Sequence, residues 1–235
     1  MNELYRFLTF KLAPEWYRLE GAEREVQKRE FARALRASGV RAHAYSLVGT
    51  RTDADLLLWA VGDELDDLTR LETHLRGTSL WAHSTRPYGY LAARRKSKYL
   101  GEHVHADSEH ARAAAGPVGD SPYLVVYPMT KVRAWYRLPL EERTRIMAGH
   151  FAIGHRYPDV RIHTAYSFGL DDQEFVVSFE VKDVRDFVAL VADLRESESS
   201  AYTQSETPIF TATACTIEEA LDLIDGAAAR APALR

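Results

Sequence analysis

The stretch AYSLVGTRTDADLLLWAVGDELDD (residues 44–67) recurs in altered form as AYSFGLDDQEFVVSFEVKDVRD (residues 165–186). Each copy begins with Ala-Tyr-Ser, passes through polar residues typical of a turn and continues as an apolar run typical of a buried strand. Similarity between two parts of one chain indicates an internal duplication. The repeated stretch therefore predicts a strand, a turn and a second strand in each half.

Outward from both copies, the chain repeats one order of elements. The first half predicts strands at 4–12, 40–48, 54–62 and 80–85, with helices at 14–37 and 63–78. The second half predicts strands at 123–129, 160–168, 174–181 and 208–214, with helices at 139–155 and 183–196. Each half reads as a ferredoxin-like βαββαβ unit, so the fold class is α+β. We expect the duplicated units to form a dimeric α+β barrel within one chain.

The predicted boundaries are residues 1–104 for the N-terminal ferredoxin-like half and 123–235 for the C-terminal half. Residues 105–122 are the predicted linker, because HADSEHARAAAGPVGDSP is polar and rich in alanine and glycine. Thr216 and Glu219 have the spacing of a capping box, which predicts that a last helix begins at TIEEALDLI.

Composition narrows the class of function. The 235 residues are 46% hydrophobic and carry a net charge of −4, and their basic residues are dispersed among acidic ones. We therefore expect no nucleic-acid partner. No stretch has the length of a membrane span and the start lacks a signal-peptide pattern, so we expect a cytoplasmic protein without a membrane partner. Cys215 is the only cysteine, so the chemistry has to come from histidine, tyrosine and carboxylates.

A histidine occupies an inward position on the predicted helix 139–155. Its spacing places His150 on the same helix face as Ile146 and Met147. A core imidazole with both nitrogens hydrogen-bonded is one interpretation, and a ligand of a metal or haem iron is the other. The position alone leaves both open.

Polar side chains accompany this histidine on two predicted strands. Alternation places Tyr127, Met129 and Lys131 on one face of the strand before the helix. On the strand after the helix, His163 shares a face with Ala165 and Ser167, and these small neighbours leave it room beside a cavity. Each residue has an ordinary structural interpretation by itself, but together they favour a site.

The run YPMTK…WY.L..EER..IM..H…G..YP, followed by SFGLDDQEFVVSFE and LRESESSAYTQSETPIF, resembles the chlorite dismutase superfamily and its coproheme decarboxylase (haem b synthase) branch. GTRTDADLLLW in the first half resembles that family too. The resemblance implies a dimeric α+β barrel that binds haem in its C-terminal half. It also implies hydrogen-peroxide-dependent oxidative decarboxylation of iron-coproporphyrin III (coproheme) to haem b via a tyrosyl radical. Coproheme would be both substrate and redox centre.

The resemblance also implies roles for individual residues. His150 falls on the proximal iron ligand and Tyr127 on the tyrosine that forms the radical. Met129 and Lys131 fall on positions that line the reactive propionates, and Ser200 on a serine that binds another propionate. The family further implies a homopentamer and a transient contact with a coproporphyrin ferrochelatase.

Two histidines compete for the role of the distal base that deprotonates peroxide. His110 precedes Tyr127 by the spacing of a distal histidine in actinobacterial decarboxylases, although its motif DSEHARA matches poorly. His163 falls on a position that is glutamine or arginine elsewhere in the family. We favour His110 and keep His163 as the alternative. The basic run AARRKSKY, with Arg94, Arg95, Lys96 and Lys98, is either a second anion site or a solvated loop.

Three other functions remain as alternatives. A chlorite dismutase would need a distal arginine where this chain has His163. A haem-binding or haem-sensing protein with weak peroxidase activity would keep His150 but would not need Tyr127 as a radical. A zinc module could use the four potential ligands of EHVHADSEH, which are His103, His105, Asp107 and His110.

Overall fold

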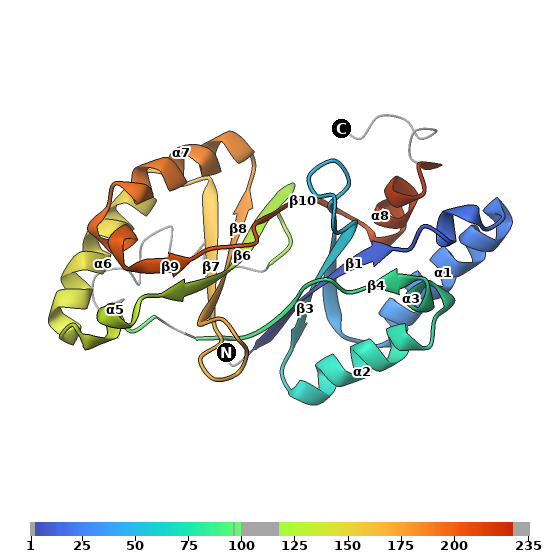
Figure 1. Ribbon diagram of the computed structural model, residues 1–235, viewed down its shortest axis with the longest axis horizontal. Helices are drawn as coiled ribbons and strands as arrows, with labels where there is room; N and C mark the ends of the chain where they lie inside the picture. Colours follow the sequence, from blue (N-terminus) through green and yellow to red (C-terminus); the bar gives the residue numbers. More distant parts are fainter. Residues whose placement is uncertain (1–2, 96, 100–117, 228–235) are drawn as a thin grey trace. The chain divides into compact units, whose positions relative to one another are not determined.

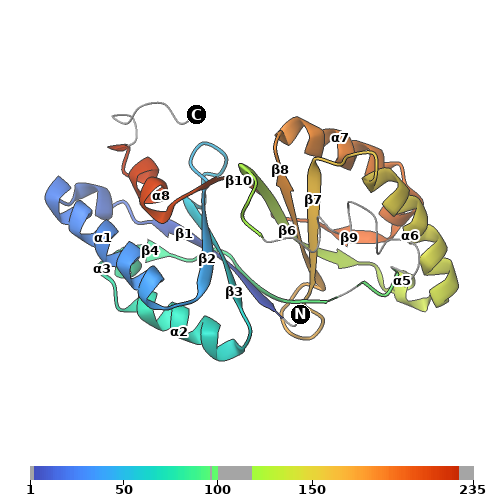
Figure 2. The same cartoon turned by 180° about the vertical axis from the view of Figure 1, so that it is seen from behind.

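The computed structural model describes residues 3–95, 97–99 and 118–227, and the chain divides into two compact units (Figures 1 and 2). Unit 1 combines residues 1–93 with residues 211–235. Unit 2 comprises residues 94–210. Both units mix helices with an antiparallel sheet, which confirms the predicted α+β class.

Unit 1 contains a sheet in the order β10-β2-β3-β1-β5, with β4 paired to β1. Its strands are β1 (Leu4–Leu12), β2 (Arg41–Ser46), β3 (Leu56–Gly62), β4 (Ser84–Thr85), β5 (Gly89–Arg94) and β10 (Phe210–Cys215). Its helices are η1 (Trp16–Arg18), α1 (Gly21–Ala37), α2 (Leu65–Arg76), α3 (Ser79–Ala82) and α8 (Ile217–Ile224).

Every residue of β3 is buried, as the apolar run in the repeated stretch predicts. Successive side chains point to opposite faces of the sheet, so Leu56 and Leu58 join the core beneath the helices. Trp59 lies on the other face and packs edge-on against Tyr5, with ring centroids 5.2 Å apart. A strand with both faces covered explains why the run has no polar residue.

The end of the chain belongs to unit 1, which differs from the predicted boundary at 123–235. Thr213–Cys215 of β10 pair with β2, and α8 buries Leu221 and Ile224 in the same core. The predicted capping box of Thr216 and Glu219 is confirmed. Antiparallel pairing with β2 and burial of the apolar face of α8 thus place this segment in unit 1.

Ion pairs fasten α8 to α1 within unit 1. Buried Lys28 donates to Asp222 at 2.6 Å and to Asp225 at 3.3 Å. Arg24 pairs with Asp225 at 2.7 Å. Because one cation is nearly enclosed by carboxylates, this contact needs both helices in place.

Unit 2 contains a sheet in the order β7-β8-β6-β9. Its strands are β6 (Tyr123–Lys131), β7 (Val160–Tyr166), β8 (Phe175–Val181) and β9 (Thr203–Ser205). Its helices are α5 (Arg133–Arg137), α6 (Leu140–Gly154), α7 (Val184–Arg195) and η2 (Glu198–Tyr202). Figure 1 shows α5, α6 and α7 on the same unit as this sheet, and Ile153 of α6 and Leu190 of α7 pack against it.

The predicted barrel is not confirmed. A barrel requires the first and last strands of a sheet to pair with each other. Within each unit the described strands follow an open order, with β10 and β5 as the outer strands of unit 1 and β7 and β9 as those of unit 2. Of the predicted linker 105–122, residues 105–117 lie outside the described part of the chain.

None of the described helices is both long and apolar enough to cross a membrane.

Candidate functional site

His150 lies on α6, one turn after buried Ile146, on the side of the helix that faces the unit 2 sheet. Its imidazole is half-buried, and its Nδ1 lies 3.1 Å from the hydroxyl of Ser199. Nε2 has no partner among the described residues. Burial, helped by the positive charge of Lys131, lowers the pKa of His150 to about 4. The imidazole is therefore neutral at pH 7 and offers a lone pair on Nε2.

Tyr127 lies on β6, on the sheet face that packs against α6 and α7. Its side chain is 7% exposed and stacks on Phe179 with ring centroids 5.8 Å apart. Burial, followed by the negative charge of Glu206, raises the pKa of Tyr127 well above its usual value. The phenol therefore keeps its hydrogen at neutral pH. Met129, two residues on, is partly buried against the same cluster.

Lys131 ends β6 as a buried cation. It is 8% exposed, and its ammonium lies 4.7 Å from the centroid of the Trp135 ring. No carboxylate of the described residues forms an ion pair with it. Burial lowers the pKa of Lys131, against the opposing charges of Glu206 and Glu174. A buried cation that lacks a counter-ion favours an anionic ligand.

Glu174 fixes the position of Lys131. Its carboxylate accepts hydrogen bonds from the backbone N–H of Lys131 at 2.9 Å and from Arg133 at 3.0 Å. Tyr136 donates its hydroxyl to the same carboxylate. This buried acid therefore holds the end of β6 against the start of α5.

Arg143 and Tyr99 are functional candidates that the sequence analysis missed. The Nε of Arg143 is buried without an acceptor, and Nη1 lies 3.5 Å from the Tyr99 hydroxyl. Tyr99 packs edge-on against Trp135, the ring that also holds Lys131, with centroids 6.1 Å apart. Burial lowers the pKa of Lys98, and the nearby positive charge of Arg143 lowers it further. The end of the basic run, for which an anion site was one of two interpretations, thus lies beside half-buried Arg143 and beside the Trp135 ring that contacts Lys131.

The structure does not place His163 with these residues. His163 pairs with Ser178 on β8, whereas Tyr127 pairs with Val177, so the two side chains lie on opposite faces of the sheet. His163 is 4% exposed, and its Nε2 lies 2.7 Å from the carboxylate of Glu180. The prediction that His163 has room beside a cavity is therefore wrong. Val160 and Ile162 are the residues of β7 that pack in the cluster with α6 and α7.

Ser200 lies in η2, next to the serine that contacts His150. It is half-buried, and its hydroxyl makes no hydrogen bond with the described residues. His110, Lys96 and the proposed zinc ligands His103, His105 and Asp107 lie outside the described residues.

Comparison with known proteins identifies the family. The chlorite dismutase family model matches residues 24–215. The chain belongs to the chlorite dismutase family. The family predicted from the sequence is thus confirmed, and with it the prediction of an enzyme.

Several known proteins match most of the chain. It is 30% identical over 177 residues to a coproheme decarboxylase from Mycolicibacterium smegmatis, covering 74% of this chain and 73% of that protein. A mutant chlorite dismutase from Candidatus Nitrospira defluvii has a TM-score of 0.87 at 25% identity, with 95% of each chain covered. A haem-binding protein from Thermus thermophilus has a TM-score of 0.83 at 25% identity, with 96% of this chain and 95% of that chain covered.

The residues of this family member fit an iron porphyrin that carries carboxylates. His150 supplies a neutral imidazole whose Nε2 is open and whose Nδ1 contacts the hydroxyl of Ser199. Histidines that bind metals have the same arrangement, in which the second ring nitrogen bonds to a neighbouring group. Lys131 and Arg143 supply buried cationic groups for carboxylates. No group of three or more metal-ligating side chains lies elsewhere in the part of the chain that the structure describes.

Glu180 forms a second buried polar cluster on the opposite sheet face. One carboxylate oxygen accepts from His163 and from Arg161 at 2.8 Å, and the other from the backbone N–H groups of Gly119 at 2.8 Å and Asp120 at 2.9 Å. Burial raises the pKa of Glu180, but the hydrogen bond from His163 and the neighbouring positive charge outweigh it, so the pKa lies below its usual value. This carboxylate ties the irregular segment just before β6 to the sheet.

We expect Glu180→Gln to destabilise the protein by about 3 kcal/mol at pH 7, since it leaves Arg161 without its buried carboxylate. A carboxyl with a lowered pKa stabilises the fold above its unfolded pKa, near 4.5, and this contribution is lost as the pH falls below that value. The difference between variant and wild type should therefore shrink below pH 4.5. Urea unfolding from pH 3 to pH 7 measures it.

Glu142→Gln is the matched control for this prediction. Glu142 also has a lowered pKa through its hydrogen bond with Arg145, but it lies at the protein surface. Its substitution should change the free energy of unfolding little. Equal effects of the two substitutions would contradict a structural role of the buried cluster.

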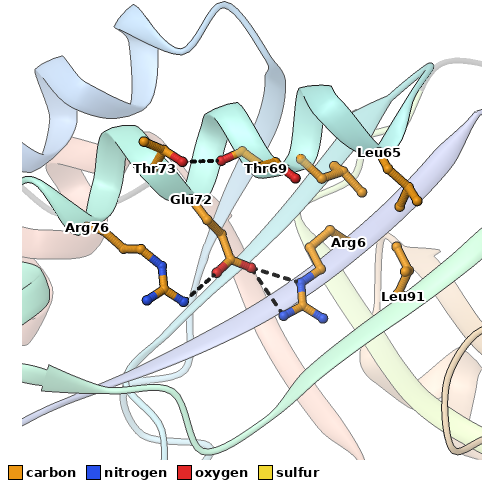
Figure 3. A pocket seen from close by; sticks show the side chains of 8 residues that line it. Arg6, Leu65, Thr69, Glu72, Thr73, Arg76 and Leu91 are labelled. Atoms are coloured by element: carbon orange, nitrogen blue, oxygen red, sulfur yellow. Dashed lines mark hydrogen bonds and ion pairs between the residues drawn. The ribbon is translucent and has the colours of Figure 1, made fainter.

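Unit 1 contains a separate cavity of about 410 Å³ between α2 and the sheet. Figure 3 shows the guanidinium groups of Arg6 and Arg76 pointing at the carboxylate of Glu72. Arg6 donates to Glu72 at 3.2 Å and Arg76 at 3.4 Å, and Gly89 leaves room for the Arg6 guanidinium. Because these charges pair with each other, the cavity lacks the unpaired cations of the site in unit 2.

Proposed function

We propose that this member of the chlorite dismutase family catalyses the hydrogen-peroxide-dependent oxidative decarboxylation of coproheme to haem b. One observation carries the proposal: a neutral histidine with an open Nε2 lies in the same unit as a buried phenol that keeps its hydrogen and as two cations, buried Lys131 and half-buried Arg143. Neither cation forms an ion pair with a carboxylate of the described residues. The similarity to a coproheme decarboxylase supports this substrate over other porphyrins.

The proposed reaction converts two propionates of coproheme to vinyl groups, one at a time. Each propionate loses carbon dioxide, a proton and two electrons, and one hydrogen peroxide accepts two electrons and two protons and becomes two waters. For each turn the balance is R–CH₂CH₂–CO₂⁻ + H₂O₂ + H⁺ → R–CH=CH₂ + CO₂ + 2 H₂O. The iron, once bound, would react with the peroxide and so supply the oxidising chemistry.

In this proposal each residue acts through a property described above. His150 holds the iron through Nε2, and Lys131 with Arg143 binds propionate carboxylates by charge-assisted hydrogen bonds. Tyr127 gives up its phenolic hydrogen, forms the radical and recovers the hydrogen from the propionate chain. Met129 borders the reacting propionates, and Ser200 donates its hydroxyl to another.

We propose His110 as the distal base and not His163. His163 lies on the sheet face opposite Tyr127 and bonds to Glu180, so it cannot reach a peroxide on the Tyr127 face. We expect His110→Ala to slow the reaction with peroxide by roughly 10²-fold or more, the usual contribution of a general base. His163→Ala should leave that rate within about twofold, because it removes no group from the Tyr127 face.

Stopped-flow mixing of the coproheme-loaded variants with peroxide measures both rates. Equal slowing by the two substitutions, or slowing by His163→Ala alone, would contradict His110 as the base.

Product analysis tests the function itself. Coproheme-loaded protein is titrated with hydrogen peroxide, and the porphyrins are identified by mass spectrometry. We expect four-propionate porphyrin to pass through a three-propionate form to haem b, with release of carbon dioxide. Bleaching of the porphyrin with all four propionates intact would refute the proposal and favour a haem-binding protein with weak peroxidase activity.

Chlorite dismutation is the second candidate, since solved chlorite dismutases share this fold. On β7 the candidate arginine is Arg161, which lies on the face of His163 and pairs with Glu180. None of the described residues of β7 therefore presents an arginine on the Tyr127 face. We expect no oxygen release when the haem-loaded protein is mixed with chlorite.

We propose further that the chain is an internal duplication of ferredoxin-like units and that it works as a cytoplasmic homopentamer. The matching order of strands and helices in the two halves supports the duplication. Coproheme would reach the site from a coproporphyrin ferrochelatase through a transient contact.

A further inference from the structure

We propose that Ser199 and Ser197 are positioning residues that hold His150 in its Nδ1–H tautomer and thereby keep Nε2 open for iron. The role of Nε2 as an iron ligand rests on the proposed function, whereas the assignment of the tautomer does not depend on it.

Three contacts link the imidazole to the backbone of α7. Nδ1 of His150 lies 3.1 Å from the hydroxyl oxygen of Ser199. That oxygen lies 2.9 Å from the hydroxyl oxygen of Ser197. The Ser197 hydroxyl lies 2.6 Å from the carbonyl oxygen of Leu194.

The last contact fixes the direction of the chain. A carbonyl oxygen can only accept, so Ser197 has to donate its one hydroxyl hydrogen to Leu194. Ser197 therefore accepts a hydrogen bond from Ser199, and Ser199 uses its single hydroxyl hydrogen to donate it. The Ser199 oxygen can then only accept from the imidazole, so the hydrogen of neutral His150 lies on Nδ1.

The surroundings make this direction hard to reverse. Ser199 is 4% exposed, so water cannot readily replace either of its partners. Leu194 lies in the last turn of α7, where carbonyl groups have no partner within the helix. Reversing the direction of these hydrogen bonds would leave this carbonyl with only the backbone N–H of Ser197, at 3.1 Å. It would also turn the half-buried hydroxyl of Ser197 and the buried hydroxyl of Ser199 around together.

The chemistry of the partner also matters for the histidine. A neutral hydroxyl accepts from Nδ1 without adding a negative charge, so it orients the ring but makes it less electron-rich than a carboxylate partner would. The pair of serines therefore sets orientation and tautomer while leaving a weakly basic ligand.

Nuclear magnetic resonance of the full-length protein without porphyrin tests the tautomer directly. With ¹⁵N-labelled histidine at pH 7.5, the Nδ1 and Nε2 shifts of His150 show which nitrogen carries the hydrogen. We expect Nδ1–H in the wild type. A wild-type spectrum with Nε2–H would overturn the proposal without the need for any variant.

Variants locate the cause. Ser199→Ala should lower the ratio of Nδ1–H to Nε2–H by roughly tenfold, the effect of one lost hydrogen bond. Ser197→Ala should lower it less, because Ser199 is then free to donate back. Ser205→Ala is the matched control, since this exposed serine of β9 takes no part in the Ser199–Ser197 hydrogen bonds, and it should leave the ratio unchanged. An unchanged ratio in Ser199→Ala would refute the role of Ser199.

A second readout uses ferrous protein loaded with haem b. We expect the iron–histidine stretching frequency in resonance Raman spectra to shift in Ser199→Ala but not in Ser205→Ala. If wild-type His150 is Nδ1–H in the protein without porphyrin and haem b shows no histidine ligation, the serine chain is upheld and the proposed iron site fails. If histidine ligation is present but the frequency is the same in wild type and Ser199→Ala, the effect of the chain on the ligand is refuted.

Discussion

We expect His150→Ala to abolish the histidine-ligated iron spectrum and to weaken haem b binding by at least about a hundredfold, the upper end of the effect of losing an outer partner of a metal ligand. The reason is that His150 supplies the neutral nitrogen that faces the polar residues of unit 2, whereas Lys131 and Arg143 can bind only carboxylates. Absorption titration with haem b measures both the spectrum and the affinity.

His155→Ala is the control, because His155 is an exposed histidine just after the same helix. It should leave the spectrum and the affinity unchanged. Added imidazole should partly restore the ligated spectrum of His150→Ala by binding where the side chain was removed. Wild-type spectrum and affinity in His150→Ala would contradict the assignment of the iron ligand.

Tyr127→Phe should bind coproheme within about twofold of the wild type and lose decarboxylation by at least about a hundredfold, which is roughly 2.7 kcal/mol in the barrier. Phenylalanine keeps the stacking on Phe179 and removes only the hydroxyl whose hydrogen the radical relay needs. The measurement is the rate of loss of the first propionate at saturating peroxide, followed by mass spectrometry.

Tyr123→Phe is the matched control for Tyr127→Phe. Tyr123 lies on the same strand and packs against the same cluster, four residues earlier. It should decarboxylate at the wild-type rate. Formation of haem b at the wild-type rate by Tyr127→Phe would show that another group abstracts hydrogen from the propionate.

Local patterns predicted the elements well. The apolar runs of β3 and β8 and the helix that carries His150 lie where the sequence places them, because periodicity and capping act over a few residues. The place of β10 was not predictable in this way. Its pairing with β2 joins residues far apart in the chain, and no local signal encodes that choice.

His163 shows where strand alternation stops being informative. The pattern correctly groups His163 with Arg161 and Ala165, but it does not say which face of β7 meets the helices. That depends on the register with β8 and on the buried Glu180, which gives this face a polar cluster of its own. A choice of the wrong face moves every side chain of the strand.

The supporting residues were the hardest to predict. Ser199 reaches His150 from 49 positions away, and Tyr99 reaches Arg143 from 44. A serine-rich run and an isolated arginine give no distinctive signal in the sequence. Only the packing of α6 against η2 and of Tyr99 against Trp135 brings them to the site.

The discontinuous make-up of unit 1 has a consequence during translation. Unit 2 is one continuous segment, complete once residue 210 has been synthesised, whereas unit 1 still lacks most of β10 and all of α8 at that moment. Domains on a ribosome generally fold in the order in which they emerge. Here the N-terminal unit is the last to be completed, because Lys28 and Arg24 have to wait for Asp222 and Asp225. A nascent chain stalled shortly after residue 210 should therefore expose an unfinished unit 1 to proteolysis while unit 2 already has all of its sequence.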